Sequence, residues 1–199
     1  MKMKTLGKAL LITLCALLLV VGSVFGTLAY LTSQDAVTNT FTVGKVVITL
    51  DEAKVDEYGV PVSPAERVKT NEYKLIPGKT YTKDPIIHVD DESEKCWLFV
   101  KIENGINAIE GNPSIATQLG NLGWSDLGGG IYAYNAIVDP DVDTDLDIEV
   151  FETFTINGDA DVALYGTAYI NITAYAVQAD GFDNAAQAWG ATFGAPSNP

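Results

Sequence analysis

The sequence has 199 residues, of which 47% are hydrophobic, and it carries 12 Lys and Arg against 26 Asp and Glu, a formal net charge of −14. A chain this acidic repels polyanions, which argues against nucleic acid as a partner. The common helix motif of zinc proteases supplies two histidine ligands and a base, whereas this chain has one histidine in all. We therefore expect a protein that is not an enzyme, and peptidase activity in particular is not expected.

The N-terminal region is predicted to be a secretory signal. An uncharged apolar run covers residues 9–31 and follows three lysines, the charge arrangement of an export signal. The run is also long enough to cross a hydrocarbon layer of about 30 Å, so a retained membrane anchor is the alternative. Small residues ending at Ala29 favour cleavage there, with Tyr30 as the new N-terminus. We expect residues 1–29 to be a signal peptide and the protein to be secreted, without stable membrane insertion.

Removal of 29 residues from 199 leaves 170, a length that suits one domain. The leader contains three of the 12 basic residues, so 9 then face 26 acidic ones and the formal charge becomes −17. No basic residue follows Lys101, whereas fourteen acidic residues do. This asymmetry serves solubility or, alternatively, the binding of divalent cations or of a basic partner.

Residues 30–42 are interpreted as an N-terminal arm and a possible donor strand. Apolar side chains at Tyr30, Val37, Phe41 and Val43 stand among mostly polar residues, so the arm gains little by collapsing onto its own domain. It could add to a neighbouring copy as a strand, and a head-to-tail contact that does not close yields a filament. The alternative is an ordinary first strand within its own sheet.

Alternation of apolar and polar residues predicts an all-β fold for residues 43–193, a two-sheet antiparallel sandwich of the jelly-roll kind. The expected strands are residues 43–50, 85–89, 96–103, 131–138, 149–156 and 164–178. Two short helices are expected, one capped by Asn112 with Pro113 first, the other capped by Asp183. Residues 194–199 are interpreted as a disordered tail.

Cys96 shares one face of an expected strand with Leu98, Val100 and Ile102, which places it in the core. Cys15 leaves with the signal peptide, so Cys96 has no partner in its own mature chain. A buried free thiol is the expected state, and an intermolecular disulfide is the alternative.

The acidic segment, residues 139–149, has a carboxylate at every second position, so an extended backbone would place all of them on one side. Calcium takes six to eight oxygen ligands, which makes this segment a candidate site. Leu146 stands where an EF-hand loop needs Gly, and no helices flank the segment. A solvated acidic loop or strand face is therefore the alternative to a calcium cofactor. The candidate ligands are Asp141, Asp143, Asp145, Asp147 and Glu149.

Several motifs together resemble the TasA/camelysin family of secreted bacterial matrix proteins. They are the leader region 26–32 continuing to 39–44, the turn 75–78, the strand 97–102, Gly123-Trp124 followed by Tyr132 and Tyr134, and residues 174–182 ahead of Trp189. The acidic segment departs from the family pattern, which more often has a Pro-Gly turn there.

This resemblance implies a jelly-roll sandwich from a Gram-positive bacterium, exported by a dedicated signal peptidase. It also implies self-assembly into fibres of a biofilm matrix, with other copies and other matrix proteins as partners. The alternative function is a monomeric secreted or surface-associated binding module. We expect assembly state to separate the two.

Overall fold

The structure is a computed structural model that describes residues 7–8, 13–19 and 45–196. The chain divides into two compact units, Met1–Thr42 and Val43–Pro199. Residues 7–8 and 13–19 of the first unit are helical. Among the described residues, no helix is both long and apolar enough to cross a membrane.

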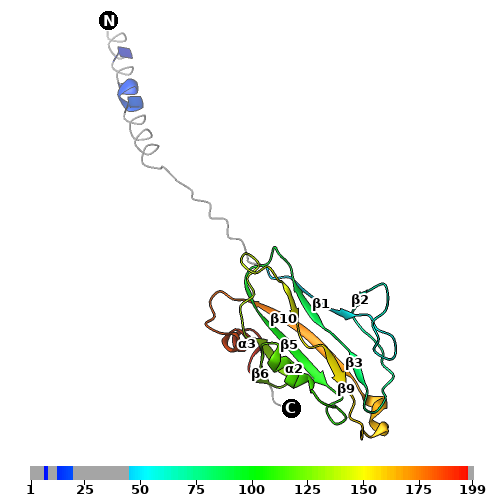
Figure 1. The fold of residues 1–199 in the computed structure, drawn as a ribbon. Helices are drawn as coiled ribbons and strands as arrows, with labels where there is room; N and C mark the ends of the chain where they lie inside the picture. The colour runs from blue at the N-terminus through cyan, green and yellow to red at the C-terminus, as the bar shows by residue number, and fades with distance from the viewer. Residues whose placement is uncertain (1–6, 9–12, 20–44, 197–199) are drawn as a thin grey trace. The chain divides into compact units, whose positions relative to one another are not determined.

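The second unit is built from antiparallel strands in three sheets (Figure 1). The first sheet has the order β2-β1-β4-β8, with bounds Arg67–Val68, Ile48–Ala53, Ile86–Val89 and Asp147–Glu149. The second has the order β10-β5-β7-β6, with bounds Ile170–Gln178, Cys96–Asn104, Ile131–Tyr134 and Trp124–Gly128. A small third sheet pairs β3, Thr80–Thr82, with β9, Thr153–Thr155. The expectation of an all-β fold is confirmed, but the small third sheet was not expected.

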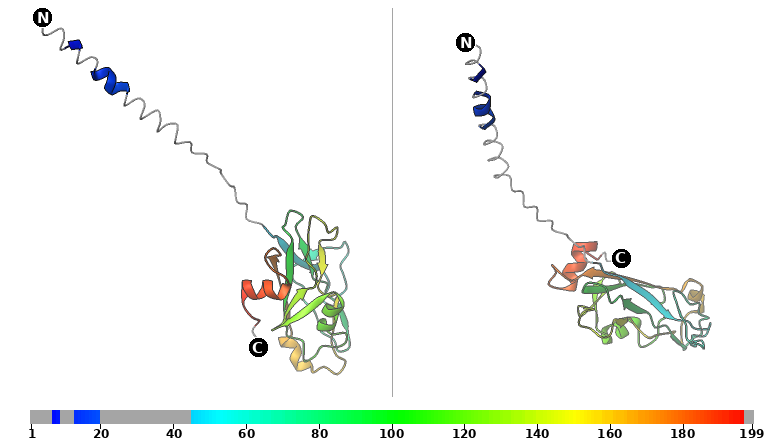
Figure 2. Two further views of the ribbon diagram at one scale, coloured as in Figure 1. Left: turned by 90° about the vertical axis from the view of Figure 1, so that its left-hand side faces the viewer. Right: turned by 90° about the horizontal axis from the view of Figure 1, so that it is seen from above.

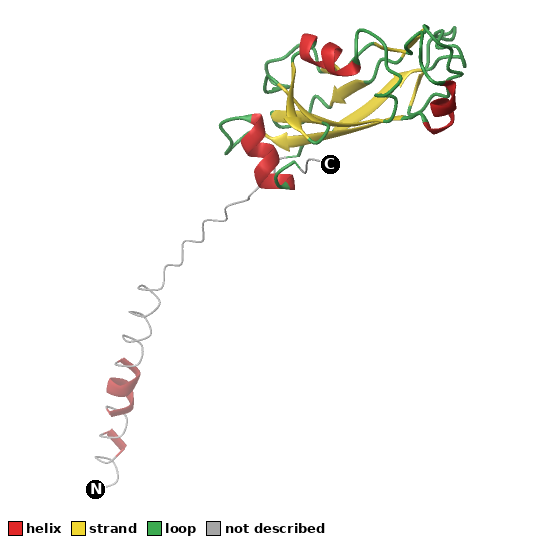
Figure 3. Cartoon of the chain, turned by 90° about the horizontal axis from the view of Figure 1, so that it is seen from below, coloured by secondary structure: helices red, strands yellow, loops and turns green. Residues whose placement is uncertain are grey.

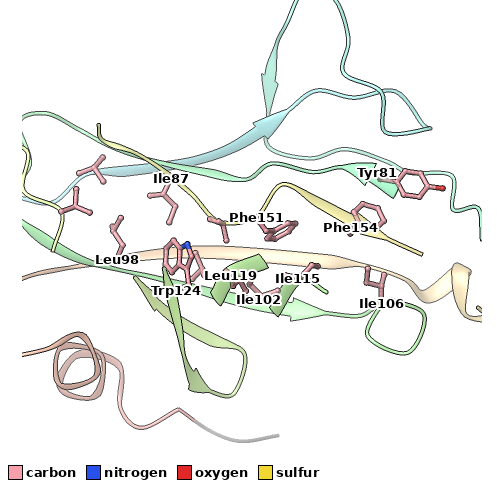
Figure 4. Packing of buried hydrophobic residues seen from close by; sticks show 14 of the residues in the cluster. Tyr81, Ile87, Leu98, Ile102, Ile106, Ile115, Leu119, Trp124, Phe151 and Phe154 are labelled. Carbon is pink, nitrogen blue, oxygen red and sulfur yellow. The ribbon is translucent and has the colours of Figure 1, made fainter. Parts of the chain in front are cut away.

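The main core lies between the two four-stranded sheets, which Figure 2 shows from two further sides. Strand β5 contributes Cys96, Leu98, Val100 and Ile102, and the facing sheet contributes Ile87 and Val89. Phe151, Phe154 and Tyr81 extend the core towards the small sheet, where the rings of Tyr81 and Phe154 stack (Figure 4). Cys96 is fully buried, as predicted, and burial raises the pKa of its thiol to about 11.

A second apolar cluster covers the opposite face of the β10-β5-β7-β6 sheet. It joins Trp97, Phe99 and Val177 to Trp189 of helix α3, Ala185–Phe193. Helix α2, Ile115–Asn121, instead contributes to the main core, so the two helices lie on opposite sides of this sheet (Figure 3). Both faces of the second sheet are therefore covered.

Two of the expected strands differ most from the structure. The expected strand 149–156 is two strands, β8 and β9, because the backbone leaves the first sheet after Glu149 and pairs with β3. The expected strand 164–178 begins only at Ile170, since residues Val162–Thr167 form a 3-10 helix capped by Asp161. The short strands β2, β3 and β6 were not predicted.

Both expected helices exist, but each is capped by a different residue. Ser114, rather than Asn112, accepts a hydrogen bond from the Thr117 amide and precedes α2. Asn184, rather than Asp183, accepts one from the Gln187 amide and precedes α3. In each case the capping side chain lies three residues before the amide it satisfies, which is the usual N-cap spacing.

The substitution Leu98→Ala tests the main core, because Leu98 is fully buried between the large sheets. We expect it to lower the free energy of unfolding by about 2–5 kcal/mol, the range for removing a buried leucine side chain. Val142→Ala is the control, since 74% of Val142 is exposed, and it should leave stability nearly unchanged. Urea denaturation followed by tryptophan fluorescence measures both; equal effects would contradict the described core.

Candidate functional site

The two large sheets leave a free strand edge along one side of the domain. Strand β10 pairs with β5 over nine residues and has no neighbour on its other side among the described residues. The backbone groups of Tyr169 and Ala179 form hydrogen bonds on the β5 side. In an antiparallel pair, the backbone groups of successive residues point alternately towards the partner strand and away from it. The backbone N–H and C=O groups of Ile170, Ile172 and the following even-numbered residues therefore point to the open edge.

Strand β1 has a shorter open edge that faces the same side. It pairs with β4 over four residues, whereas β2 covers only Glu52 and Ala53. The Val47 carbonyl accepts a hydrogen bond from Asp90 of the β4 side. By the same alternation, the backbone groups of Ile48 and Leu50 point away from β4. Two incomplete edges, one from each large sheet, thus flank the same side of the sandwich.

A groove of about 930 Å³ lies between these edges. Its wall includes Leu50, Asp51 and Glu52 of β1, Tyr169 and residues Ile170 to Thr173 of the β10 side, and residues 69–73 and Leu75 of the connection after β2. Apolar side chains from both sheets line the groove together with charged ones. Such a groove can receive an extended segment, because backbone groups are available along β10 and apolar contacts lie beneath.

Lys69 lies at the β1 edge of the groove. Its exposed side chain donates a hydrogen bond from Nζ to the backbone carbonyl of Leu50, one of the groups on the open edge. A lysine at a sheet edge is a common protection against unwanted strand pairing. Lys69 therefore occupies the β1 edge, and the β10 edge is the more accessible of the two.

A buried ion pair supports the wall of the groove. Lys83 contacts Glu52 through Nζ and Oε2, and both side chains are at least 90% buried. Asn71 donates from Nδ2 to Glu52 Oε1 at 3.0 Å and to the Ala53 carbonyl at 2.8 Å. Burying two charges is unfavourable unless they are paired and hydrogen-bonded. This network fixes the connection after β2 against β1.

Removal of one member of this pair should be strongly destabilising. We expect Lys83→Met to lower the free energy of unfolding by about 3–5 kcal/mol, because Glu52 would remain charged and buried without a cation. The double variant Lys83→Met with Glu52→Gln keeps an acceptor for Asn71 and removes the unpaired charge. It should be more stable than the single variant in urea denaturation, and the opposite order would contradict this account.

A chain of charged contacts crosses β1, β4 and β8 next to the groove. His88 bonds to Asp147 at 2.6 Å through Nδ1 and to Asp51 at 3.0 Å through Nε2. Asp51 also contacts Arg67, which reaches Asp84 at 3.2 Å. Burial lowers the pKa of His88, but the Asp51 and Asp147 carboxylates outweigh it and raise the pKa above its ordinary value. Burial raises the pKa of Asp51, but Arg67 and His88 reverse this and lower it.

The raised pKa of His88 makes part of the stability depend on pH. A raised folded-state pKa gives stability that is fully present below about pH 6.5 and is lost as the pH rises through the folded value. Wild-type protein should therefore melt at a higher temperature than His88→Gln in mildly acidic buffer, and the difference should shrink towards pH 8.5. Thermal melting of both proteins across this range tests the effect; a constant difference would exclude it.

The acidic segment forms a turn and a loop up to Leu146 and becomes a strand only at Asp147. Asp139 begins a turn, and its backbone amide donates a hydrogen bond to the Asp143 carboxylate. The Asp145 carboxylate accepts a hydrogen bond from the backbone amide of Asp147. Asp147 is held by His88, and Glu149 lies within β8. Across the described residues, no three metal-ligating side chains converge, Asp141 included. Calcium binding at this segment stays a prediction.

Most other predicted functional positions lie outside the described residues. These are the cleavage positions Ala29 and Tyr30 and the arm positions Val37, Phe41 and Val43. The groove and its polar network were missed by the sequence analysis. The pattern in residues 43–50 predicted a strand but gave no indication of which edge would remain open.

Comparison with known proteins gives no relative. No protein-family model, curated protein or solved structure matches the chain. Inference about function therefore rests on the groove, the two open edges and the sequence resemblance described above.

Proposed function

We propose that the protein is a secreted structural protein of an extracellular biofilm matrix that assembles into fibres. Residues 30–43 of one copy would lie as an added strand in the groove of the next copy. The observation that carries this proposal is the groove of about 930 Å³ flanked by the open edge of β10. Because the strand and the groove are separate parts of each copy, the contact is head-to-tail, and it builds a fibre when its rotation does not close a ring.

The dimensions of the arm suit the edge. Fourteen extended residues span roughly 46 Å at about 3.3 Å per residue, and the nine residues of β10 span roughly 30 Å. The arm therefore exceeds the length of the edge and leaves residues for a connection between copies. Asp35 is its only charged residue, so the arm can approach an acidic domain with little repulsion.

The groove also offers polar groups that an added strand could use. Alternate backbone groups of β10 point to the open edge, and Tyr165, which lines the groove, has a buried hydroxyl without a partner among the described residues. Pairing with an incoming backbone would satisfy the outward-pointing groups of β10. The two four-stranded sheets around one core also support the jelly-roll topology that the family resemblance implies.

A monomeric secreted binding module is the alternative for the same groove. Electron microscopy of the exported product separates the two, with mass spectrometry to establish whether Tyr30 is its first residue. Fibres that disappear when residues 30–40 are deleted would support strand donation. A persistent monomer at high concentration would overturn the proposal and favour the binding module.

A proline at the open edge provides a sharper test. The N–H of Ile172 points away from β5, so Ile172→Pro keeps the bonds to β5, and proline is tolerated in edge strands at such positions. It removes one donor and places a ring where the added strand would lie. We expect the protein concentration needed for fibre formation to rise about tenfold or more. A tenfold rise corresponds to a loss of about 1.4 kcal/mol of association free energy for each contact between copies.

Ile172→Ala is the matched control, because it loses the same side-chain contacts but keeps the N–H. It should form fibres at a lower protein concentration than the proline variant does, as judged by light scattering and electron microscopy. If the alanine and proline variants assembled equally well, the β10 edge would not be the acceptor.

A further inference from the structure

The single charge of the arm falls on the side that an acceptor groove would cover. Side chains of an extended strand alternate between two faces. If the arm adds as a strand, one of its faces would carry Leu31, Ser33, Asp35, Val37, Asn39, Phe41 and Val43, and the other Tyr30, Ala36 and mainly Thr and Gln. The first face is the more apolar and would turn towards the groove. Asp35 would then be enclosed with it, and a carboxylate in such a place needs a cation.

The groove is lined by two cations, Lys69 and Lys83. Lys83 is buried and already paired with Glu52. Lys69 is exposed and bonds to the Leu50 carbonyl, with no carboxylate partner among the described residues. Since an ammonium group has three N–H donors, Lys69 can keep this hydrogen bond and donate another to a carboxylate.

The carboxylates of the groove make this cation necessary. Asp51, Glu52, Glu72 and Glu103 all line the groove. The first two are bound by Arg67 and Lys83, and Glu103 pairs with Lys101 at 3.1 Å. An incoming Asp35 without a cation would meet only negative or already neutralised groups. Lys69 is thus the groove residue suited to receive it.

We propose that Asp35 of one copy forms an ion pair with Lys69 in the groove of the next copy, and that this pair sets the register of the added strand. The proposal rests on the proposed function. Register in strand pairing must be specified by particular contacts, because a slip of one residue turns every side chain to the opposite face. One charge in the arm and one available cation in the groove define a single matching position.

Charge reversal tests the pair. Asp35→Lys and Lys69→Asp should each raise the concentration needed for fibre formation about tenfold or more, because each places like charges together. The two variants mixed in equal amounts should assemble again, since each arm then finds an opposite charge in the other protein's groove. Lys74→Asp is the matched control, because it makes the same charge change at an exposed lysine that does not line the groove. This variant should assemble as the wild type does.

The outcomes separate this pair from the assembly itself. If the wild type forms fibres and both charge-reversed variants form them at the same protein concentration, the Asp35–Lys69 pair is refuted. Strand donation itself would not be contradicted by that result. Rescue in a double variant but not in the mixture would mean that the arm lies in its own groove, which overturns pairing between copies. Absence of wild-type fibres would refute the proposed function. Thermal melting of each variant monitors folding, and Asp35→Asn with Lys69→Gln repeats the test without charge reversal.

Discussion

The fold depends on β5, which is enclosed on both faces and both edges. Its even-numbered residues face the other large sheet in the main core, and Trp97 and Phe99 face the cluster under α3. Strands β10 and β7 pair with its two edges. In the order β10-β5-β7-β6, β10 lies at the margin of the sheet, and its second edge has no neighbour among the described residues. The open edge thus lies directly beside the strand around which the core is built.

The sequence predicted β5 almost to the residue, because five successive apolar residues, 96–100, lead into the alternating residues 101–104 and are preceded by charged ones. It also predicted the location of Cys96, since that argument needed only the face of one strand. Prediction was weaker where tertiary pairing decides the outcome. The sequence after Glu149 has the pattern of a continued strand, yet the backbone there leaves the first sheet and pairs with β3. Residues 164–167 were predicted as part of a strand but belong to a 3-10 helix capped by Asp161.

The groove could not be predicted for a similar reason. Its polar network joins Glu52 to Lys83 and Asp51 to His88 across separations of more than thirty residues. The alternation of apolar and polar residues within a strand indicates which face of the sheet a side chain occupies. It does not indicate which other strand lies next to that strand. The acidic segment shows the same limit, because its spacing suggested an extended row of ligands, whereas hydrogen bonds to backbone amides fold it into a turn.

The helix α3 has a consequence for how copies of this domain can associate. It covers the outer face of the β10-β5-β7-β6 sheet with Trp189, and the inner face of that sheet is already used in the main core. Lateral stacking of this sheet, the arrangement that thickens cross-β fibrils into insoluble bundles, is therefore blocked. An assembly that uses the β10 edge would grow in one dimension from domains that stay folded, and each subunit would keep its own hydrophobic core.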